Sequence, residues 1–412
     1  MKTNGVSVVI LSISALIVLA KDSSAKPNIF TDLPSREQVL LAKQLHLYKI
    51  NSTYAALYRK TFGSLGQHAK ESVGADFACP RLSPSPTLPT SVHSLRPSDV
   101  KVIAAIGDSL SAGRGADNGI IGLLVDYRGL SWSIGGDKSY NKMITLPNIL
   151  REYNSGLFGY SEGSGDSRAR LNVAESGAKA RDALGQAQRL VSLMKESSDV
   201  DFNNDWKVIT LFIGGNDLCD WCQDTNEYSV EKYAAHLQET LDYLHANVPR
   251  AFINLVEVLN IEIVRDLADN LLCSAIHFFA CDCAANPDNQ GDLEQLIRLR
   301  ESYQQAARDL AASGRYDTRD DFTVVLQPFY RETFLPRTES GDVDMSYFAS
   351  DCFHHSIKGQ QAAASALWNN MIEPIGSKRL TWMPGEPIEC PTEAFPYFYT
   401  SKNSAKVAQP NH

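Results

Sequence analysis

The sequence predicts an α/β protein whose mainly parallel, five-stranded sheet is covered by helices on both faces. Two observations support this prediction. Short apolar runs of the kind that form buried strands recur through residues 99–380, and stretches with apolar residues at helical spacing lie between them. Strands that alternate with helices pair in parallel, so their carboxyl ends meet at one edge of the sheet, where such folds bind ligands.

Five apolar runs mark the expected strands. The run "VKVIAAIG" (100–107) is typical of a buried strand and "WKVITLFIGG" (206–215) of a strong one, whereas "RLNVAE" (170–175) is weaker. Two further runs, at 250–259 and 321–329, complete the predicted sheet.

Four segments between or after these runs place apolar residues on one helical face. The expected helices are a segment containing Leu184 and Met194, followed by 229–247, 292–312 and 357–371.

The remaining sequence surrounds one main domain at 99–380. Residues 26–98 are expected to form a helical extension and then a connector whose prolines and serines disfavour regular structure. Residues 381–412 are expected to form a C-terminal tail, whose end, "SKNSAKVAQPNH", is polar. At 1–25, Lys2 precedes an uncharged apolar stretch and then small residues, a pattern typical of a secretory signal peptide.

Cleavage of this leader is expected after Ala20 or Ala25. The alternative is a membrane anchor, but the apolar stretch is short for a membrane span. The chain has 412 residues and a net charge of −9 without a basic run, which argues against nucleic-acid binding. We expect a secreted, extracellular protein.

Eight cysteines, all beyond the leader, fit an exported protein, because an even number in an oxidising compartment favours disulfides. The alternative for Cys219, Cys222, Cys281 and Cys283 is a zinc site, although zinc-type spacing is only half met. Asn51, in "NST", is a predicted N-glycosylation site on the same lumenal route.

Reactive residue types follow four of the expected strands. Ser109 in "GDSL" follows the first strand, Gly177 in "ESGA" the second and Asn216 in "GGND" the third. Asp351 and His354, in "DCFHH", come after the last strand. Ester hydrolysis needs these types: a serine nucleophile, a histidine base oriented by a carboxylate, and donors for the developing oxyanion.

Neighbouring residues compete for these roles. His355 is an alternative base, but the three-residue spacing from the acid favours His354 and leaves His355 in a supporting or solvated position. Asp108 and Asp217 are expected to hold loops through backbone hydrogen bonds. The remaining histidines carry no supporting pattern and are interpreted as structural or surface residues: His236, His245 and His277 among them.

These four motifs, in this order, resemble those of the SGNH (GDSL-type) hydrolases over residues 99–375. The stretches "YRGLSWSIGGD" (127–137) and "DCFH" (351–354) are more narrowly similar to the catalytic repeats of the phospholipase B family. Members of that family can carry several repeats and a membrane anchor; we expect a single repeat here and do not carry membrane attachment over.

The resemblance implies a three-layer, flavodoxin-like SGNH-hydrolase fold with its catalytic domain at 99–380. It also implies Ser109 as the nucleophile, Asp351 and His354 as its partners, and Gly177 and Asn216 as oxyanion donors with the Ser109 amide.

The expected activity is that of a secreted serine esterase or lipase that hydrolyses phospholipids and lysophospholipids through an acyl-enzyme. It would act at a transient membrane or micelle surface, without a metal or other cofactor. The alternatives are an esterase for acetylated carbohydrates or other short esters, and a secreted binding glycoprotein without turnover. The apolar segment 271–283 could line an acyl pocket, form a lid, or be a core helix stapled by cysteines.

Overall fold

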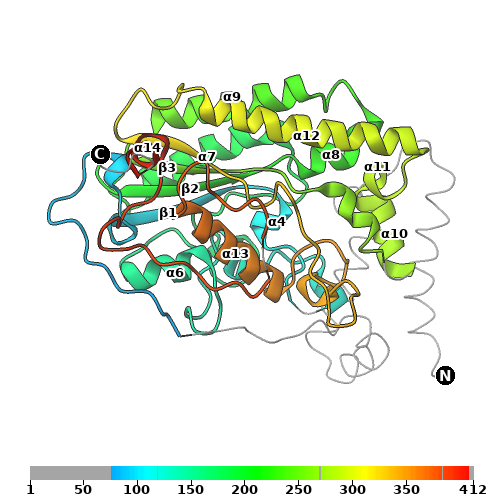
Figure 1. The fold of residues 1–412 in the computed structure, drawn as a ribbon, viewed down its shortest axis with the longest axis horizontal. Helices are drawn as coiled ribbons and strands as arrows, with labels where there is room; N and C mark the ends of the chain where they lie inside the picture. Colours follow the sequence, from blue (N-terminus) through cyan, green and yellow to red (C-terminus); the bar gives the residue numbers. More distant parts are fainter. Residues whose placement is uncertain (1–75, 118, 269–270, 383, 408–412) are drawn as a thin grey trace.

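Four parallel strands form the sheet at the centre of the molecule (Figure 1). The computed structural model describes residues 76–117, 119–268, 271–382 and 384–407. The predicted leader, the helical extension and Asn51 therefore lie outside the described residues. The strands are β1 (Val100–Gly107), β2 (Trp206–Phe212), β3 (Ala251–Val256) and β4 (Phe322–Gln327), hydrogen-bonded in the order β1-β2-β3-β4.

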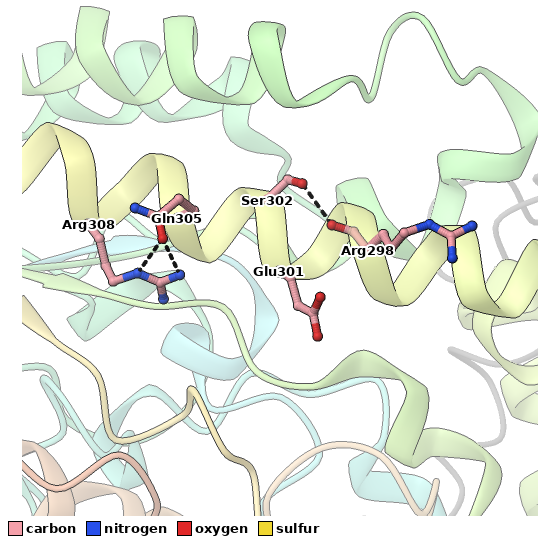
Figure 2. A pocket seen from close by; sticks show the side chains of 5 residues that line it. All are labelled: Arg298, Glu301, Ser302, Gln305 and Arg308. Carbon is pink, nitrogen blue, oxygen red and sulfur yellow. Dashed lines mark hydrogen bonds between the residues drawn. The ribbon is translucent and has the colours of Figure 1, made fainter.

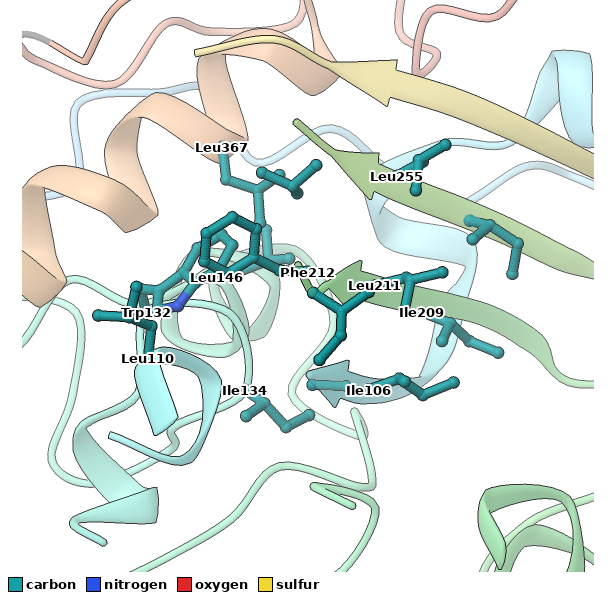
Figure 3. Packing of buried hydrophobic residues seen from close by; sticks show 14 of the residues in the cluster. Ile106, Leu110, Trp132, Ile134, Leu146, Ile209, Leu211, Phe212, Leu255 and Leu367 are labelled. Atoms are coloured by element: carbon teal, nitrogen blue, oxygen red, sulfur yellow. The ribbon is translucent and has the colours of Figure 1, made fainter. Parts of the chain in front are cut away.

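The strands lie where the apolar runs predicted them because both faces of the sheet are covered. Every residue of β2 and β3 is buried, which requires the continuous apolar pattern seen in the sequence. Figure 3 shows the packing at the strand ends, where Trp132 and Leu367 lie close to Phe212. The rings of Trp132 and Phe212 meet edge to face, with centroids 5.7 Å apart.

The fifth predicted strand, at 170–175, does not form, and this prediction was wrong. Arg170 has a left-handed backbone (φ 50°), and the N–H of Asn172 bonds to the carbonyl of Ala169 in a turn. The segment keeps an isolated parallel bridge between Asn172 and Ala105, and the N–H of Glu175 donates to the carbonyl of Gly107. The segment 170–175 still lies beside β1, on the side away from β2. The chain therefore keeps the flavodoxin-like order, in which the second predicted strand flanks the first.

Helices cover the two faces of the sheet as separate layers. Figure 1 shows α7 (Ala183–Glu196), α9 (Val230–Asn247) and α12 (Gln290–Ala312) above the sheet, with α6 (Leu146–Tyr153) and α13 (Ile357–Met371) below it. The four predicted helices are confirmed. Two of them begin with a side-chain cap: the Asn289 side chain accepts the N–H of Asp292 in α12, and the Ser356 hydroxyl accepts the N–H of Gly359 in α13.

Shorter helices follow strands β1 to β3 near the carboxyl edge of the sheet: α4 (Ser109–Ala112), α5 (Gly119–Gly122), α8 (Gly215–Asp220), α10 (Leu271–Ala280) and α11 (Asp282–Ala285). Helix α14 (Ser401–Val407) lies toward the opposite edge, where Ser401 contacts Asp317 ahead of β4 (Figure 1).

The connector and the tail both pack onto the main domain. Cys79 in the connector forms a disulfide with Cys390 in the tail. Trp382 and Phe398, both in the tail, are buried, and the Phe398 ring lies 5.4 Å from that of Phe252 in β3. Within the described ranges, no helix combines the length and the apolar composition that crossing a membrane requires.

Candidate active site

Ser109 is the first residue of α4 and lies directly beyond the end of β1. Asp108 caps this short helix, because its carboxylate accepts the N–H of Leu110 at 2.9 Å. Gly107 leaves no room for a side chain: a Cβ there would lie 2.6 Å from the carbonyl oxygen of Phe212. The strand-to-helix turn therefore needs glycine and presents the Ser109 hydroxyl at the carboxyl edge of the sheet.

The acid–base loop (residues 349–355) brings a histidine and an aspartate to Ser109. The Oγ of Ser109 lies 2.7 Å from Nε2 of His354, and Nδ1 of His354 lies 2.6 Å from Oδ2 of Asp351. Both distances are within hydrogen-bond range, and all three side chains are buried. The sequence separates Ser109 from His354 by 245 residues, so the fold alone creates this contact.

The Asp351 carboxylate is held in its ionised form. Burial raises its pKa. The neighbouring His354 lowers it, as do hydrogen bonds from the His354 side chain and from the N–H groups of Phe353 and His354. Together these outweigh burial, so the net shift of the pKa is downward. The two backbone N–H groups both bind Oδ1, each at 3.0 Å. Oδ2 is thereby left to face the ring of His354.

His355 does not reach Ser109. Its ring stacks on Trp382, with centroids 5.1 Å apart, and its Nε2 lies 3.4 Å from the hydroxyl of Tyr330. The side chain is buried rather than solvated. Burial, with a smaller contribution from His354, lowers its pKa to about 3, so His355 remains neutral. It is the ring of His354, and not that of His355, that contacts Ser109.

The two predicted oxyanion donors lie on neighbouring loops. Gly177 has a positive φ of 84°, a conformation that favours glycine. Asn216 lies in the first turn of α8, and its Nδ2 donates to the carbonyl of Ala178 at 2.9 Å. This hydrogen bond joins the loop after the predicted second strand to the loop after β2. The side-chain amide has a second hydrogen that can donate to another acceptor.

Two buried aspartates support these loops, as expected. Asp217 accepts the N–H of Ala180 at 3.0 Å, which fixes the segment after Gly177. Burial raises the pKa of Asp217 to about 6, partly offset by this hydrogen bond. Burial likewise raises the pKa of Asp108 to about 7, partly offset by the Leu110 N–H and by His354.

Disulfides pair all eight cysteines, as expected for an exported protein. Besides the Cys79 to Cys390 bond, Cys219 joins Cys281 and Cys222 joins Cys283, so the four candidate zinc ligands are oxidised instead. Cys352 of the acid–base loop is bonded to Cys273 of α10. The segment 271–283 is helical and stapled by cysteines, as in one of its three alternatives, but it is not a core helix, because Ser274 is exposed.

His277 is a residue near the site that the sequence did not single out. It is buried in α10, and its Nε2 lies 3.0 Å from the carbonyl oxygen of Asp351. The only sequence signal was its position four residues after Cys273, which places both on one helical face.

A hollow on the surface of α12 lies apart from these residues. It is lined by Arg298, Glu301, Ser302, Gln305 and Arg308. Figure 2 shows that Arg308 already donates to Gln305, with 2.8 Å from Nη2 to Oε1. None of the predicted site residues lines this hollow.

The sheet, its helical layers and the hydrogen-bonded serine, histidine and aspartate at its edge are features of a hydrolytic α/β enzyme. Residues 103–367 match the family model of the GDSL-like lipases and acylhydrolases. The chain belongs to this family and is a carboxylic ester hydrolase.

Curated relatives are named phospholipase B1, membrane-associated. The mouse protein (Mus musculus) is 45% identical over 372 residues, which are 87% of this chain and 25% of that protein. The human protein (Homo sapiens) is 48% identical over 343 residues, covering 80% of this chain and 24% of that protein. The chain thus spans about a quarter of the length of these relatives. A solved structure described as a GDSL-like lipase, from Parabacteroides merdae, aligns with a TM-score of 0.35 and 16% identity over 68% of this chain and 95% of that one.

Proposed function

We propose that this chain hydrolyses the acyl ester bonds of phospholipids and lysophospholipids through a Ser109–His354–Asp351 triad and an acyl-enzyme. The observation that carries the proposal is the unbroken hydrogen-bonded chain from the Asp351 carboxylate through the His354 ring to the Ser109 hydroxyl. A serine hydroxyl becomes an effective nucleophile only when a base takes its proton, and this chain supplies the base.

In the first half of the reaction, Ser109 Oγ forms a bond to the ester carbonyl carbon while Nε2 of His354 takes its proton. The electron pair of the carbonyl double bond moves to oxygen and creates an oxyanion. Asp351 stabilises the imidazolium that forms, because its carboxylate accepts the hydrogen on Nδ1. The tetrahedral intermediate then breaks its bond to the leaving oxygen, which takes the proton from His354 and departs as an alcohol.

The oxyanion is stabilised by the N–H groups of Ser109 and Gly177 and by the side-chain amide of Asn216. Donors already held in place cost no reorganisation during the reaction. The hydrogen bond from Asn216 to Ala178 supports this role because it fixes the orientation of the amide. In the second half, His354 deprotonates a water, which attacks the acyl carbon, and collapse of the intermediate releases the fatty acid and restores Ser109.

A lipid substrate is supported by the composition around the triad. Helix α10, sequence "LLCSAIHFFA", is attached to the acid–base loop by the Cys273–Cys352 disulfide. Phe353 is half-buried, and its ring lies 5.1 Å from that of His354 in an edge-to-face arrangement. The apolar Phe353 ring beside the His354 ring favours a long acyl chain over an acetyl group. The similarity to proteins named phospholipase B1 points to the same substrates.

We infer that the protein is exported and meets its substrate at a membrane or micelle surface. Four disulfides are typical of an oxidising compartment. The signal-like leader and the acceptor Asn51 support the same route.

Comparing long-chain with acetyl esters tests the substrate. The substrates are long-acyl phosphatidylcholine vesicles, lysophosphatidylcholine micelles, acetylated xylan and p-nitrophenyl acetate, each with wild type and Ser109→Ala. We expect kcat/KM to be higher for the long-acyl substrates by roughly tenfold or more, since each buried methylene is worth about 0.8 kcal/mol. Preference for the acetyl esters would favour the short-ester alternative, and no turnover of any substrate would favour a binding protein.

A further inference from the structure

Helix α10 contacts the acid–base loop at two positions one helical turn apart. Cys273 is bonded to Cys352, and four residues later the ring of His277 lies against the backbone of Asp351 and Cys352. Because residues i and i+4 share one face of a helix, a single face of α10 holds both loop residues. It does so by one covalent bond and by hydrogen bonds.

The protonation of His277 follows from its surroundings. Burial lowers the pKa of the ring, although Asp351 and nearby backbone groups oppose the shift, so the imidazole is neutral at physiological pH. A neutral imidazole carries a single N–H. Nε2 lies 3.0 Å from the carbonyl oxygen of Asp351 and 3.2 Å from that of Cys352, and both oxygens can only accept. The backbone of Val264 also neighbours the ring, but Nδ1 forms no hydrogen bond within the part of the chain that the structure describes, so we place the hydrogen on Nε2.

The loop backbone needs this donor. Cys352 has a left-handed conformation (φ 58°), which non-glycine residues rarely adopt unless their surroundings enforce it. Asp351 is 1% exposed and Cys352 is 2% exposed, so bulk water does not hydrate this stretch. A buried carbonyl that loses its donor is strongly unfavourable, and the loop would shift to find another one.

We propose that His277 is a positioning residue of the acid–base loop, whose Nε2–H holds the backbone of Asp351 and Cys352 and thereby keeps the Asp351 carboxylate aimed at His354. The inference rests on the proposed catalytic roles of Asp351 and His354. His277 touches neither substrate nor reacting atoms and acts only through the loop.

Helix α10, which carries His277, is itself attached by disulfides to the segment around α8, on the Asn216 side of the site. Helix α10 leads into α11: Cys281, between the two helices, is bonded to Cys219 in α8, and Cys283 in α11 is bonded to Cys222 just beyond α8. Helix α8 carries Asn216 in its first turn. Because α10 is anchored in this way, loss of the His277 hydrogen bonds displaces the loop instead of being absorbed by a movement of the helix.

Two substitutions separate a donor role from a packing role. His277→Leu fills much of the volume of the ring but cannot donate, whereas His277→Gln restores an N–H donor at a similar reach. We expect His277→Leu to lower kcat roughly ten- to hundredfold with KM changed less than about twofold, because displacements near 1 Å carry penalties of this size. His277→Gln should stay within about threefold of wild type. The assay uses a soluble p-nitrophenyl ester and the full-length protein.

A matched control and a spectroscopic readout accompany the kinetics. His245→Leu removes a half-buried histidine of α9 whose Nε2 lies 3.1 Å from Thr318 Oγ1, away from the loop, and should leave kcat unchanged. The proton on Nδ1 of His354, in its 2.6 Å contact with Asp351, should resonate far downfield by NMR. We expect His277→Leu to shift or broaden this resonance and His277→Gln to preserve it.

The proposal is overturned if His277→Leu keeps kcat within about threefold, or if His277→Gln loses as much activity as His277→Leu. These results would leave the proposed function intact, provided that Ser109→Ala and Asp351→Asn are inactive. Full activity in those two variants would instead reject the triad. If the leucine variant does not fold, nitrogen chemical shifts of wild-type His277 decide: the proposal requires hydrogen on Nε2, and hydrogen on Nδ1 overturns it.

Discussion

Replacing Asp351 by asparagine changes the chemistry of the triad while keeping the shape of the side chain. One carboxylate oxygen accepts the N–H groups of Phe353 and His354, each at 3.0 Å, and the other faces Nδ1 of His354 at 2.6 Å. The amide oxygen of asparagine must stay with the two backbone donors, because these are buried and would otherwise lose their acceptor. The amide nitrogen then points at Nδ1.

This arrangement forces the wrong tautomer on His354. The amide nitrogen donates to Nδ1, so the ring hydrogen moves to Nε2, which can no longer take the proton of Ser109. In serine proteases the corresponding change lowers kcat about 10⁴-fold, or about 5 kcal/mol in the barrier. We expect a loss of similar size here, with little change in KM, since the substituted side chain does not contact substrate.

Steady-state hydrolysis of a soluble ester measures the effect, with unfolding curves to show that the variant is folded. Asp344→Asn is the matched control: its carboxylate accepts the N–H of Ser346 at 3.0 Å in a similar turn but faces no histidine. This control should keep kcat within about twofold. A kcat for Asp351→Asn within about tenfold of wild type would refute the tautomer argument.

Three further predictions follow from the geometry. Asn216→Ala should lower kcat roughly a hundredfold by steady-state assay, the usual effect of one lost oxyanion donor, and near-normal turnover would reject that role. Asp108→Asn keeps the helix cap but removes a carboxyl whose pKa is raised to about 7 in the folded state. Ionising this carboxyl destabilises the folded wild type as the pH rises. The variant should therefore be more stable than wild type, by a free energy of unfolding that grows from about pH 4 to about pH 7 and then levels off at up to roughly 4 kcal/mol. Equal gains in denaturant titrations at pH 4 and pH 8 would contradict this. Replacing Cys79 and Cys390 together by serine should lower the free energy of unfolding by about 2–5 kcal/mol and leave kcat unchanged, and an unaltered denaturation midpoint would argue against their bond.

The sheet could largely be predicted because burial on both faces demands continuous apolar runs. This requirement leaves a clear signal in β1 to β4 but a weak one at 170–175. There, Asn172 is buried, and its side chain binds the carbonyl of Ser111 and the N–H of Ala174. Such local side-chain bonds compete with strand pairing, and neither apolar pattern nor residue propensity reports the left-handed turn at Arg170.

The residues of the candidate site could be predicted where their position after a strand determines where they lie. Parallel strands bring their carboxyl ends to one edge, so Ser109, Asn216 and the acid–base loop were expected to meet. The role proposed for His277 depends on a helix packing against a loop 74 residues away, a tertiary contact without a local pattern. Disulfide pairing was unpredictable for the same reason, because cysteine positions alone do not determine which sulfur atoms meet.

The identity of the nucleophile is the central claim, and covalent labelling tests it most directly. A fluorophosphonate probe reacts with an activated serine, and mass spectrometry of the digested protein locates the adduct. We predict one adduct on Ser109, abolished in Ser109→Ala and retained in Ser111→Ala, a neighbouring buried serine of the same helix. An adduct on another residue, or labelling that persists in Ser109→Ala, would contradict the account.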